Sequence, residues 1–290
     1  MSEIVEALFS GLATGSLFAL SGIGIVVIFR VTKLVNFAQG VFPVFAGFVM
    51  FSLLQTHLPW VAAGVVAAVV SALLGVVLGW CVLLRRVKSA LAAVFILLGL
   101  AIVLEGVFVL GWGDQPISYQ SVVSGTIHVA GTVVEPEDLV LIVVTLLSVA
   151  ALQLFFARTY LGKAMTAAAA NYDASKLVGI SLLSVGSIAF ALSGLLGGIA
   201  GVLSTSTLPI TYTSDVLFTV YAFAAAIVGN LESPVGTLVG GLVLGELEAF
   251  VSISSFASYA EVVALVGLLV VLVARSGSTS SWFQARRSLH

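Results

Sequence analysis

The chain has 290 residues, of which 60% are hydrophobic and only 8% are charged, and its formal net charge is -2. Soluble domains carry about 25% charged residues, so this composition excludes a water-soluble globule and predicts a chain solvated by lipid. The small net charge gives no sign of a nucleic-acid partner. The single cysteine, Cys81, excludes an intrachain disulfide and a thiolate metal cluster.

Apolar segments follow one another along the chain, interrupted by charged residues or proline. Seven or more of them reach the roughly 20 apolar residues that a spanning helix needs. They are apolar all round, which excludes an outer-membrane barrel. The fold class predicted is all-α, a polytopic transmembrane helix bundle with about 8–9 spans. The expected segments are residues 8–29, 36–54, 61–84, 90–112, 138–157, 183–203, 215–229, 235–253 and 259–274.

The seventh and eighth segments, residues 215–229 and 235–253, leave two interpretations open. The seventh is short and is followed by Asn230 and Pro234. The two segments either span the membrane fully or form a re-entrant pair that enters from outside. The neighbouring loops lie outside in both cases, so charge does not separate the alternatives.

The basic residues occur only in alternate gaps between the segments. This pattern predicts that all of them lie on the cytoplasmic side, that the N-terminus is outside and that the C-terminus is cytoplasmic. Lys88, Lys163 and Arg275 are therefore expected inside, whereas Gln120 and Thr211 are expected outside. The basic residues are Arg30, Lys33, Arg85, Arg86, Lys88, Arg158, Lys163, Lys176, Arg275, Arg286 and Arg287.

Many of the 29 glycines are spaced four residues apart, which is typical of closely packed membrane helices. We expect these glycines to serve helix packing, with a hinge role as the alternative. The pairs are Gly11/Gly15, Gly75/Gly79, Gly194/Gly198, Gly197/Gly201, Gly236/Gly240 and Gly241/Gly245.

Few residues within the segments can carry chemistry. No expected span contains a histidine or a lysine, and no glycine-rich loop ends in Gly-Lys-Ser/Thr, so neither an intramembrane protease nor a P-loop ATPase is indicated. Three acids do fall inside spans, namely Glu105, Glu246 and Glu248. Such a carboxyl group either lines a substrate path or is a neutral packing residue. No metal site is expected.

The longest cytoplasmic gap, residues 158–181, is expected to form two short helices. Residues 163–170 are strong helix formers, Asn171 can cap a second helix and Gly179 can stop it. We expect the first helix to expose Met165 and several alanines, an arrangement that suits docking into another protein's groove. The alternative is an ordinary amphipathic connector at the membrane surface.

Four stretches of the sequence resemble the permease subunits of branched-chain amino acid ABC importers. Residues 11–20 resemble the opening helix of this family, and Asn-Phe-Ala-Gln-Gly at 36–40 is similar to its Asn-Phe-Ala-His-Gly-Glu motif. Residues 162–180 resemble the loop that touches the ATPase. Residues 226–249 are similar to the family's glycine-rich C-terminal region. The likeness covers most of the chain, in order, and favours the shorter of the two permease types.

The resemblance implies a role and partners for the chain. It implies one transmembrane permease domain over residues 1–290 with the ATPase-coupling loop at about 158–181, in the inner membrane of a prokaryote. The implied partners are a second homologous permease, two ATPase subunits that bind ATP and Mg, and an extracytoplasmic binding protein, while this chain binds no cofactor and is no enzyme. The substrate-path candidates are Asn36, Gln39, Glu105, Asn230 and Glu248, and the coupling candidates are Gly162, Lys163, Met165, Ala167, Ala168, Asn171 and Gly179.

Departures from the family pattern keep the substrate open. Gln39 stands where the family usually has histidine and Val41 where it has glutamate, while Thr166 and Ala170 replace an arginine and a glutamate of the coupling loop. The expected cargo is a branched-chain or related small amino acid. Urea, short amides and other small carboxylates are the alternative. An ion-coupled secondary transporter and a structural membrane scaffold are the rival classes.

Overall fold

The computed structural model describes residues 2–84, 89–121, 123, 125, 127–129, 132–254, 262 and 266. The expected ninth segment, residues 259–274, and the basic residues at 85–88 and 275–287 lie outside these residues. The helices and strands are α1 (Ser2–Thr32), α2 (Val41–Gln55), α3 (Trp60–Leu83), α4 (Ala90–Trp112), β1 (Ile127–Val129), β2 (Thr132–Val134), α5 (Pro136–Arg158), α6 (Tyr160–Ala170), α7 (Tyr172–Leu177), α8 (Leu182–Ser204), α9 (Ser214–Val228) and α10 (Pro234–Ser252).

The all-α fold class is confirmed for the described residues, with one small β-hairpin in addition. Six helices, α1, α3, α4, α5, α8 and α10, are long and apolar enough to cross a membrane. The helices α2 and α9 have 15 residues each. At 1.5 Å per residue such a helix is about 22 Å long, less than the roughly 30 Å hydrocarbon core of a bilayer.

Helix starts follow local capping chemistry. Ser181 Oγ accepts a hydrogen bond from the Ser184 N–H at 3.0 Å at the start of α8. Ser233 does the same for Gly236 at the start of α10, where Pro234 occupies the first turn. These caps satisfy backbone donors that have no partner inside the helix, so the boundaries lie close to those expected from the sequence.

The expected segment 36–54 begins later in the structure, at Val41. The Asn36 side chain accepts a hydrogen bond from the Ala38 N–H at 3.0 Å, and this local turn competes with a helix. Residues 33–40 therefore form a non-helical break between α1 and α2, and this part of the prediction was wrong.

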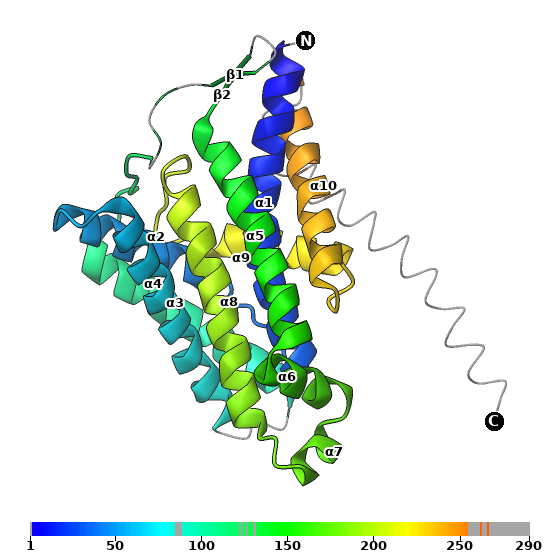
Figure 1. Ribbon diagram of the computed structural model, residues 1–290. Helices are drawn as coiled ribbons and strands as arrows, with labels where there is room; N and C mark the ends of the chain where they lie inside the picture. Colours follow the sequence, from blue (N-terminus) through cyan, green and yellow to red (C-terminus); the bar gives the residue numbers. More distant parts are fainter. Residues whose placement is uncertain are drawn as a thin grey trace.

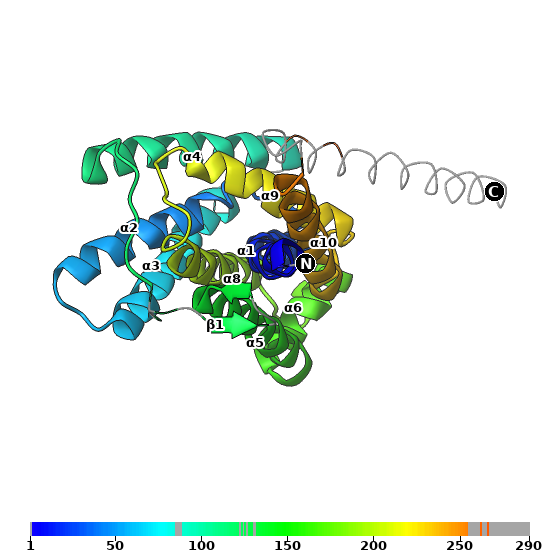
Figure 2. The ribbon, with the colours of Figure 1, turned by 90° about the horizontal axis from the view of Figure 1, so that it is seen from above.

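Helix α1 lies in the middle of the bundle. Figure 2 shows it from its N-terminal end, with α5, α8, α9 and α10 arranged around it, whereas α4 lies at the edge (Figure 1). Most of α1 is buried by protein although the helix is apolar all round, whereas only a small share of the residues of α4 and α5 is buried. Helix α1 is thus a central element, and the outer helices present apolar faces of the kind that lipid covers.

The glycine pairs expected to mediate packing do so. A Cβ at Gly15 would lie 2.7 Å from the carbonyl oxygen of Gly241, so α1 and α10 meet backbone to backbone. On the other side of the bundle, a Cβ at Gly194 of α8 would collide with the carbonyl oxygen of Ser71 in α3. Any larger side chain at these positions would push the helices apart.

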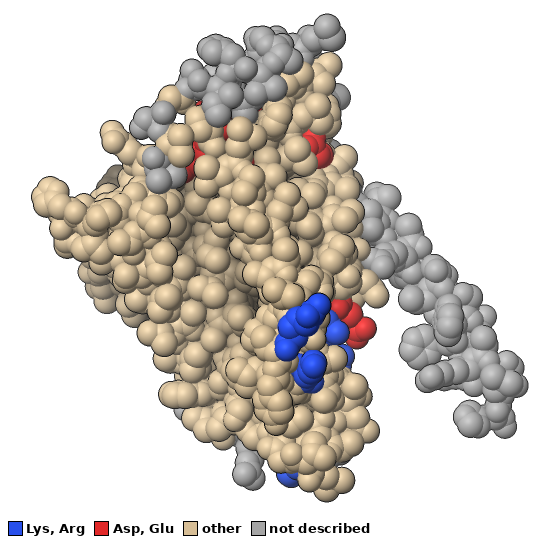
Figure 3. All heavy atoms as spheres, viewed as in Figure 1, with Lys and Arg blue, Asp and Glu red and all other residues tan. Residues whose placement is uncertain are grey.

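Charged side chains separate toward opposite ends of the bundle. At one end, the Arg30 guanidinium lies over the Phe156 ring, so the last turns of α1 and α5 are neighbours. At the other end, Glu6 of α1 and Asp138 of α5 line one cavity. Figure 3 shows basic residues on the lower part of the molecule, with an acidic group beside them, and further acidic residues near the top. We call these the basic end and the acidic end.

The turn between α9 and α10 lies at the basic end. Lys33 Nζ, just after α1, pairs with Glu232 Oε1 at 3.3 Å. Asn230 and Leu231 adopt positive φ angles of 73° and 53° there, a conformation that asparagine tolerates better than most residues. The chain therefore approaches the α1 C-terminus before α10 returns along α1.

Loops at the acidic end are tied together. A β-bridge joins Ile117 to Ile210, and Tyr119 donates a hydrogen bond to the carbonyl oxygen of Val202 at 2.7 Å. Burial raises the pKa of the Tyr119 hydroxyl, which keeps it a donor. The hairpin of β1 and β2, with Ile127 opposite Val134, lies in the long loop between α4 and α5.

Candidate functional site

A buried polar cluster fills the break between α1 and α2. Gln39 Oε1 accepts hydrogen bonds from Ser193 Oγ of α8 at 2.7 Å and from Asn36 Nδ2 at 3.3 Å. Gly40 donates its backbone N–H to Thr219 Oγ1 of α9 at 2.8 Å. Asn36 and Gln39 are both completely buried. Asn36 and Gln39 thus join the break to α8, and the Gly40 backbone joins it to α9.

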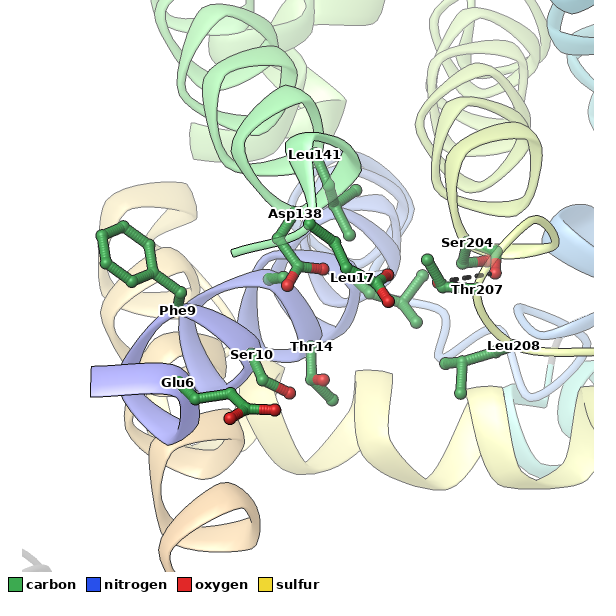
Figure 4. Close-up of a pocket in the computed structure, with 12 residues that line it drawn as sticks. Glu6, Phe9, Ser10, Thr14, Leu17, Asp138, Leu141, Ser204, Thr207 and Leu208 are labelled. Atoms are coloured by element: carbon green, nitrogen blue, oxygen red, sulfur yellow. Dashed lines mark hydrogen bonds between the residues drawn. The ribbon is translucent and has the colours of Figure 1, made fainter. Parts of the chain in front are cut away.

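An outer cavity of about 270 Å³ opens at the acidic end between α1, α5 and the loop after α8. Figure 4 shows the polar groups of α1 on one side of it and Asp138 of α5 on the other. Its polar lining consists of Glu6, Ser10, Thr14, Glu135, Asp138, Ser204 and Thr207. The cavity is therefore acidic and rich in hydroxyl groups.

An inner cavity of about 250 Å³ continues from the outer one. The two share Thr14, Leu17 and Leu208, and the inner cavity reaches further along α1. At this depth Phe18 and Tyr221 stack with their ring centroids 4.3 Å apart. The inner cavity is lined by Thr14, Leu17, Phe18, Leu208, Pro209, Ile210, Ser214, Leu217, Phe218, Tyr221 and Glu248.

Of the three acids expected within spans, only Glu248 is among the residues that line the two cavities. Glu246 lies in the contact between α10 and α1, where a Cβ on Gly11 would be 3.1 Å from its carboxyl carbon. Glu105 of α4 is half-buried and lies close enough to the carboxyl group of Asp215 to interact with it electrostatically. Asp215 itself is buried, with 3% of its surface exposed.

The five path candidates do not form one cluster. Asn36 and Gln39 meet each other, Glu248 lines the inner cavity and Glu105 faces Asp215. Asn230 is exposed in the turn at the basic end. The sequence did not reveal Thr14 and Ser214, whose hydroxyl groups line the inner cavity together with Glu248. Serine and threonine are common in membrane helices, and no local signal marks these two as cavity residues.

The expected pair of short helices is present at the basic end. Helix α6 begins at Tyr160, earlier than expected, because Thr159 Oγ1 accepts the Gly162 N–H at 2.9 Å. Asn171 Oδ1 caps α7 by accepting the Ala174 N–H at 3.0 Å, and Gly179 follows the helix with a φ of 83°. The cap at Asn171 and the stop at Gly179 are confirmed.

The expectation that Met165 is exposed was wrong. Met165 is fully buried and Ala168 is only 3% exposed, because this face of α6 packs onto the core of the bundle. Gly162 is also buried, in backbone contact with Phe155 and Phe156 of α5. An 11-residue helix of small residues carries too little amphipathic signal to show which face turns inward.

The surface that remains for a partner is the opposite face of this pair. Lys163, Ala167 and Asn171 are exposed, and so is Lys176. Three large side chains that the sequence did not single out are also exposed, Tyr160 at 83%, Leu177 at 88% and Val178 at 77%. We call these seven residues the α6–α7 surface. The sequence signal for this surface was the pair of apolar residues, Leu177 and Val178, next to Lys176 in a short loop.

Sequence comparisons identify the family. The family described as "Branched-chain amino acid transport system / permease component" matches residues 7–273. The high-affinity branched-chain amino acid transport system permease protein LivH of Salmonella typhimurium is 27% identical over 288 residues, covering 93% of this chain and 92% of that protein. BraD of Pseudomonas aeruginosa, a permease protein of the same description, is 26% identical, covering 93% and 94%.

A more distant likeness covers less of the chain. The ribose import permease protein RbsC of Haemophilus influenzae is 30% identical over 123 residues, which is 40% of this chain and 38% of that protein. No solved structure matches. The family match spans nearly the whole chain and agrees with the apolar helices, and this chain is therefore a multi-pass membrane protein of the branched-chain amino acid transport system permease family.

Proposed function

We propose that this chain is the membrane-spanning permease subunit of an ATP-driven importer that carries branched-chain or related small amino acids across the inner membrane of a prokaryote. The observation that carries the proposal is the family match over residues 7–273. Relatives described as high-affinity branched-chain amino acid permeases, aligned along more than nine-tenths of this chain, support it. Urea, short amides and small carboxylates remain the alternative cargo.

The proposed topology has about 8–9 spans, with the N-terminus outside and the C-terminus in the cytoplasm. The separation of charge supports it. Arg30 and Lys33 lie at the C-terminal end of α1, and Lys163 lies in α6, just after the C-terminal end of α5. Glu6 and Asp138 lie near the starts of α1 and α5 and line the outer cavity. The basic end would face the cytoplasm. The Lys33–Glu232 pair supports a turn between α9 and α10 that reaches the cytoplasmic side.

Residues 1–290 would form one permease domain that couples to ATPases through residues 158–181. The exposed apolar residues Leu177 and Val178 at the basic end support this role, because a partner groove can bury them. Two ATPase subunits would bind ATP and Mg, while this chain contributes the docking helices and binds no cofactor.

The outer and inner cavities would form the extracytoplasmic entrance of the substrate path. A binding protein would release its cargo at the acidic end, and a second homologous permease would complete the translocation unit. Closure of the ATPases would then rock the permeases between outward-open and inward-open states. The outer cavity lies at the end of the bundle opposite α6 and α7, and this position supports entry of the cargo from the extracytoplasmic side.

A second candidate function is an ion-coupled secondary transporter. Partial-length helices that meet within the bundle are typical of that class, and here Gly40, at the start of α2, touches the backbone of Asp215, at the start of α9. The two candidates differ in what drives uptake.

Reconstitution into liposomes separates them. The chain, its second permease, the ATPases and the binding protein are assembled, and uptake of radiolabelled leucine is measured with ATP or with a proton gradient as the energy source. The proposal expects uptake that needs ATP and the binding protein. Uptake driven by the gradient without the ATPases would overturn it in favour of the secondary transporter.

A further inference from the structure

We propose that the inner cavity is a selectivity site of the permease itself, in which Glu248 receives the ammonium group of the cargo. The inference rests on the proposed importer function, and it narrows the cargo to small molecules that combine an ammonium group with an apolar body. The permease would therefore select the cargo a second time, after the binding protein has done so.

The shape and lining of the inner cavity fit such a molecule. Its volume is about 250 Å³, and Leu17, Leu217 and Phe218 supply apolar surface from α1 and α9. The stacked rings of Phe18 and Tyr221 add aromatic surface to this lining. A branched aliphatic side chain would lose its water against these walls, which is favourable.

The carboxyl groups that line the two cavities favour a ligand with a positively charged group. Among the described residues that line the inner cavity, Glu248 alone is charged, and neither cavity is lined by a described lysine, arginine or histidine. The approach through the outer cavity passes Glu6, Glu135 and Asp138. A cation is attracted along this route, whereas an anion without an ammonium group meets carboxylates at every step.

Hydroxyl groups complete the polar part of the site. Thr14 and Ser214 line the inner cavity together with Glu248, so an amino acid that places its ammonium group on Glu248 meets hydroxyl donors for its carboxylate. Ser214 Oγ is held in place because it accepts the Thr211 N–H at 2.9 Å. An uncharged ligand such as urea carries no positive charge to compensate the Glu248 carboxylate. Binding urea there would leave that carboxylate desolvated and unpaired, so the site selects against urea.

Glu246 provides a matched control for Glu248. It lies on the same helix two residues earlier, about 200° around the helix axis, and contacts α1 at Gly11 instead of lining the inner cavity. Glu248→Gln removes the charge at the cavity and keeps the size of the side chain. Glu246→Gln makes the same chemical change outside the cavity.

The first measurement is binding, which does not depend on ATP-driven transport. Leu208 is exposed, at 47%, and is shared by both cavities, so a cysteine there in a Cys81→Ser background reports on ligands through its rate of maleimide labelling. The reconstituted permease complex is treated with maleimide in the presence of leucine, leucine amide or isocaproate. Leucine and leucine amide are expected to slow labelling, and isocaproate, which lacks the ammonium group, is expected to have no effect.

Glu248→Gln should raise the leucine concentration needed for half-maximal protection by roughly tenfold or more, while Glu246→Gln leaves it unchanged. Glu248→Asp, which keeps the charge, should restore part of the protection by leucine. This variant shows whether the loss of protection in Glu248→Gln is caused only by misfolding. Equal protection by isocaproate, or unchanged protection in Glu248→Gln, would overturn the inference. Protection by leucine without ATP-dependent uptake would instead overturn the importer function and leave the selectivity site standing.

Discussion

Ser193 Oγ donates a hydrogen bond of 2.7 Å to Gln39 Oε1, and this contact joins the middle of α8 to the break between α1 and α2. Gln39 lies against Gly24 of α1, where no side chain separates the amide from the helix backbone. The polar break is thus enclosed by α1 and α8, and by α9 through the bond from the Gly40 N–H to Thr219. Burial within protein is how non-helical backbone is accommodated at membrane depth. Its stability depends on close packing as well as on hydrogen bonds.

Replacing Gly24 with alanine should destabilise the protein. A Cβ at this position would lie 2.7 Å from Ser193 Oγ and would also collide with the Gln39 amide, and overpacking of this kind costs about 1–3 kcal/mol. The midpoint of thermal unfolding in detergent should fall. Gly106→Ala of α4 is the control, because its Cβ would meet nothing within 4 Å. Equal midpoints for the two variants would show that the cluster tolerates a larger side chain.

Cysteine labelling from each side of the membrane tests the topology. In a Cys81→Ser background, cysteines at Gln120 and Thr211 should react with an impermeant reagent from outside, and cysteines at Lys163 and Glu232 only from the cytoplasm. Glu232 decides between spanning and re-entry, since its Lys33 partner lies at the basic end. Labelling of position 232 from outside alone would favour the re-entrant pair.

The Glu105–Asp215 contact predicts the effect of two substitutions in α4. Glu105→Gln should fold and support nearly normal uptake, because a glutamine can still donate a hydrogen bond to Asp215. Glu105→Leu should insert normally but transport poorly, because it leaves the buried Asp215 without its partner. ATP-dependent leucine uptake, normalised to the amount of protein, compares the two. Normal uptake in the leucine variant would make Glu105 a packing residue, and loss in the glutamine variant would point to a required charge.

Most helices were predictable from sequence because a helix that spans a bilayer needs about 20 apolar residues. All eight expected segments that fall within the described residues correspond to helices, and the cap at Asn171 was visible from its type and position. The start of α2 was not predictable from hydropathy, because the turn at Asn36 interrupts an apolar run without lowering its average.

The site was less predictable because it is assembled from distant parts of the chain. Glu248 was recognisable as an intramembrane acid, but its neighbours Thr14 and Ser214 come from α1 and α9. The burial of Met165 likewise depends on which face of α6 meets the bundle. Tertiary packing decides both, and local sequence does not encode it.

The most direct test of the account is whether the α6–α7 surface couples the permease to an ATPase. Ala167 is exposed there, and a partner groove would have to bury a new charge at a cost of several kcal/mol, so Ala167→Glu should insert normally yet retain little ATPase on purification. Ala167→Ser, which adds no charge, should retain it. ATP-dependent leucine uptake should fall with the bound ATPase in the glutamate variant alone. Normal ATPase retention and uptake in Ala167→Glu would contradict docking at this surface.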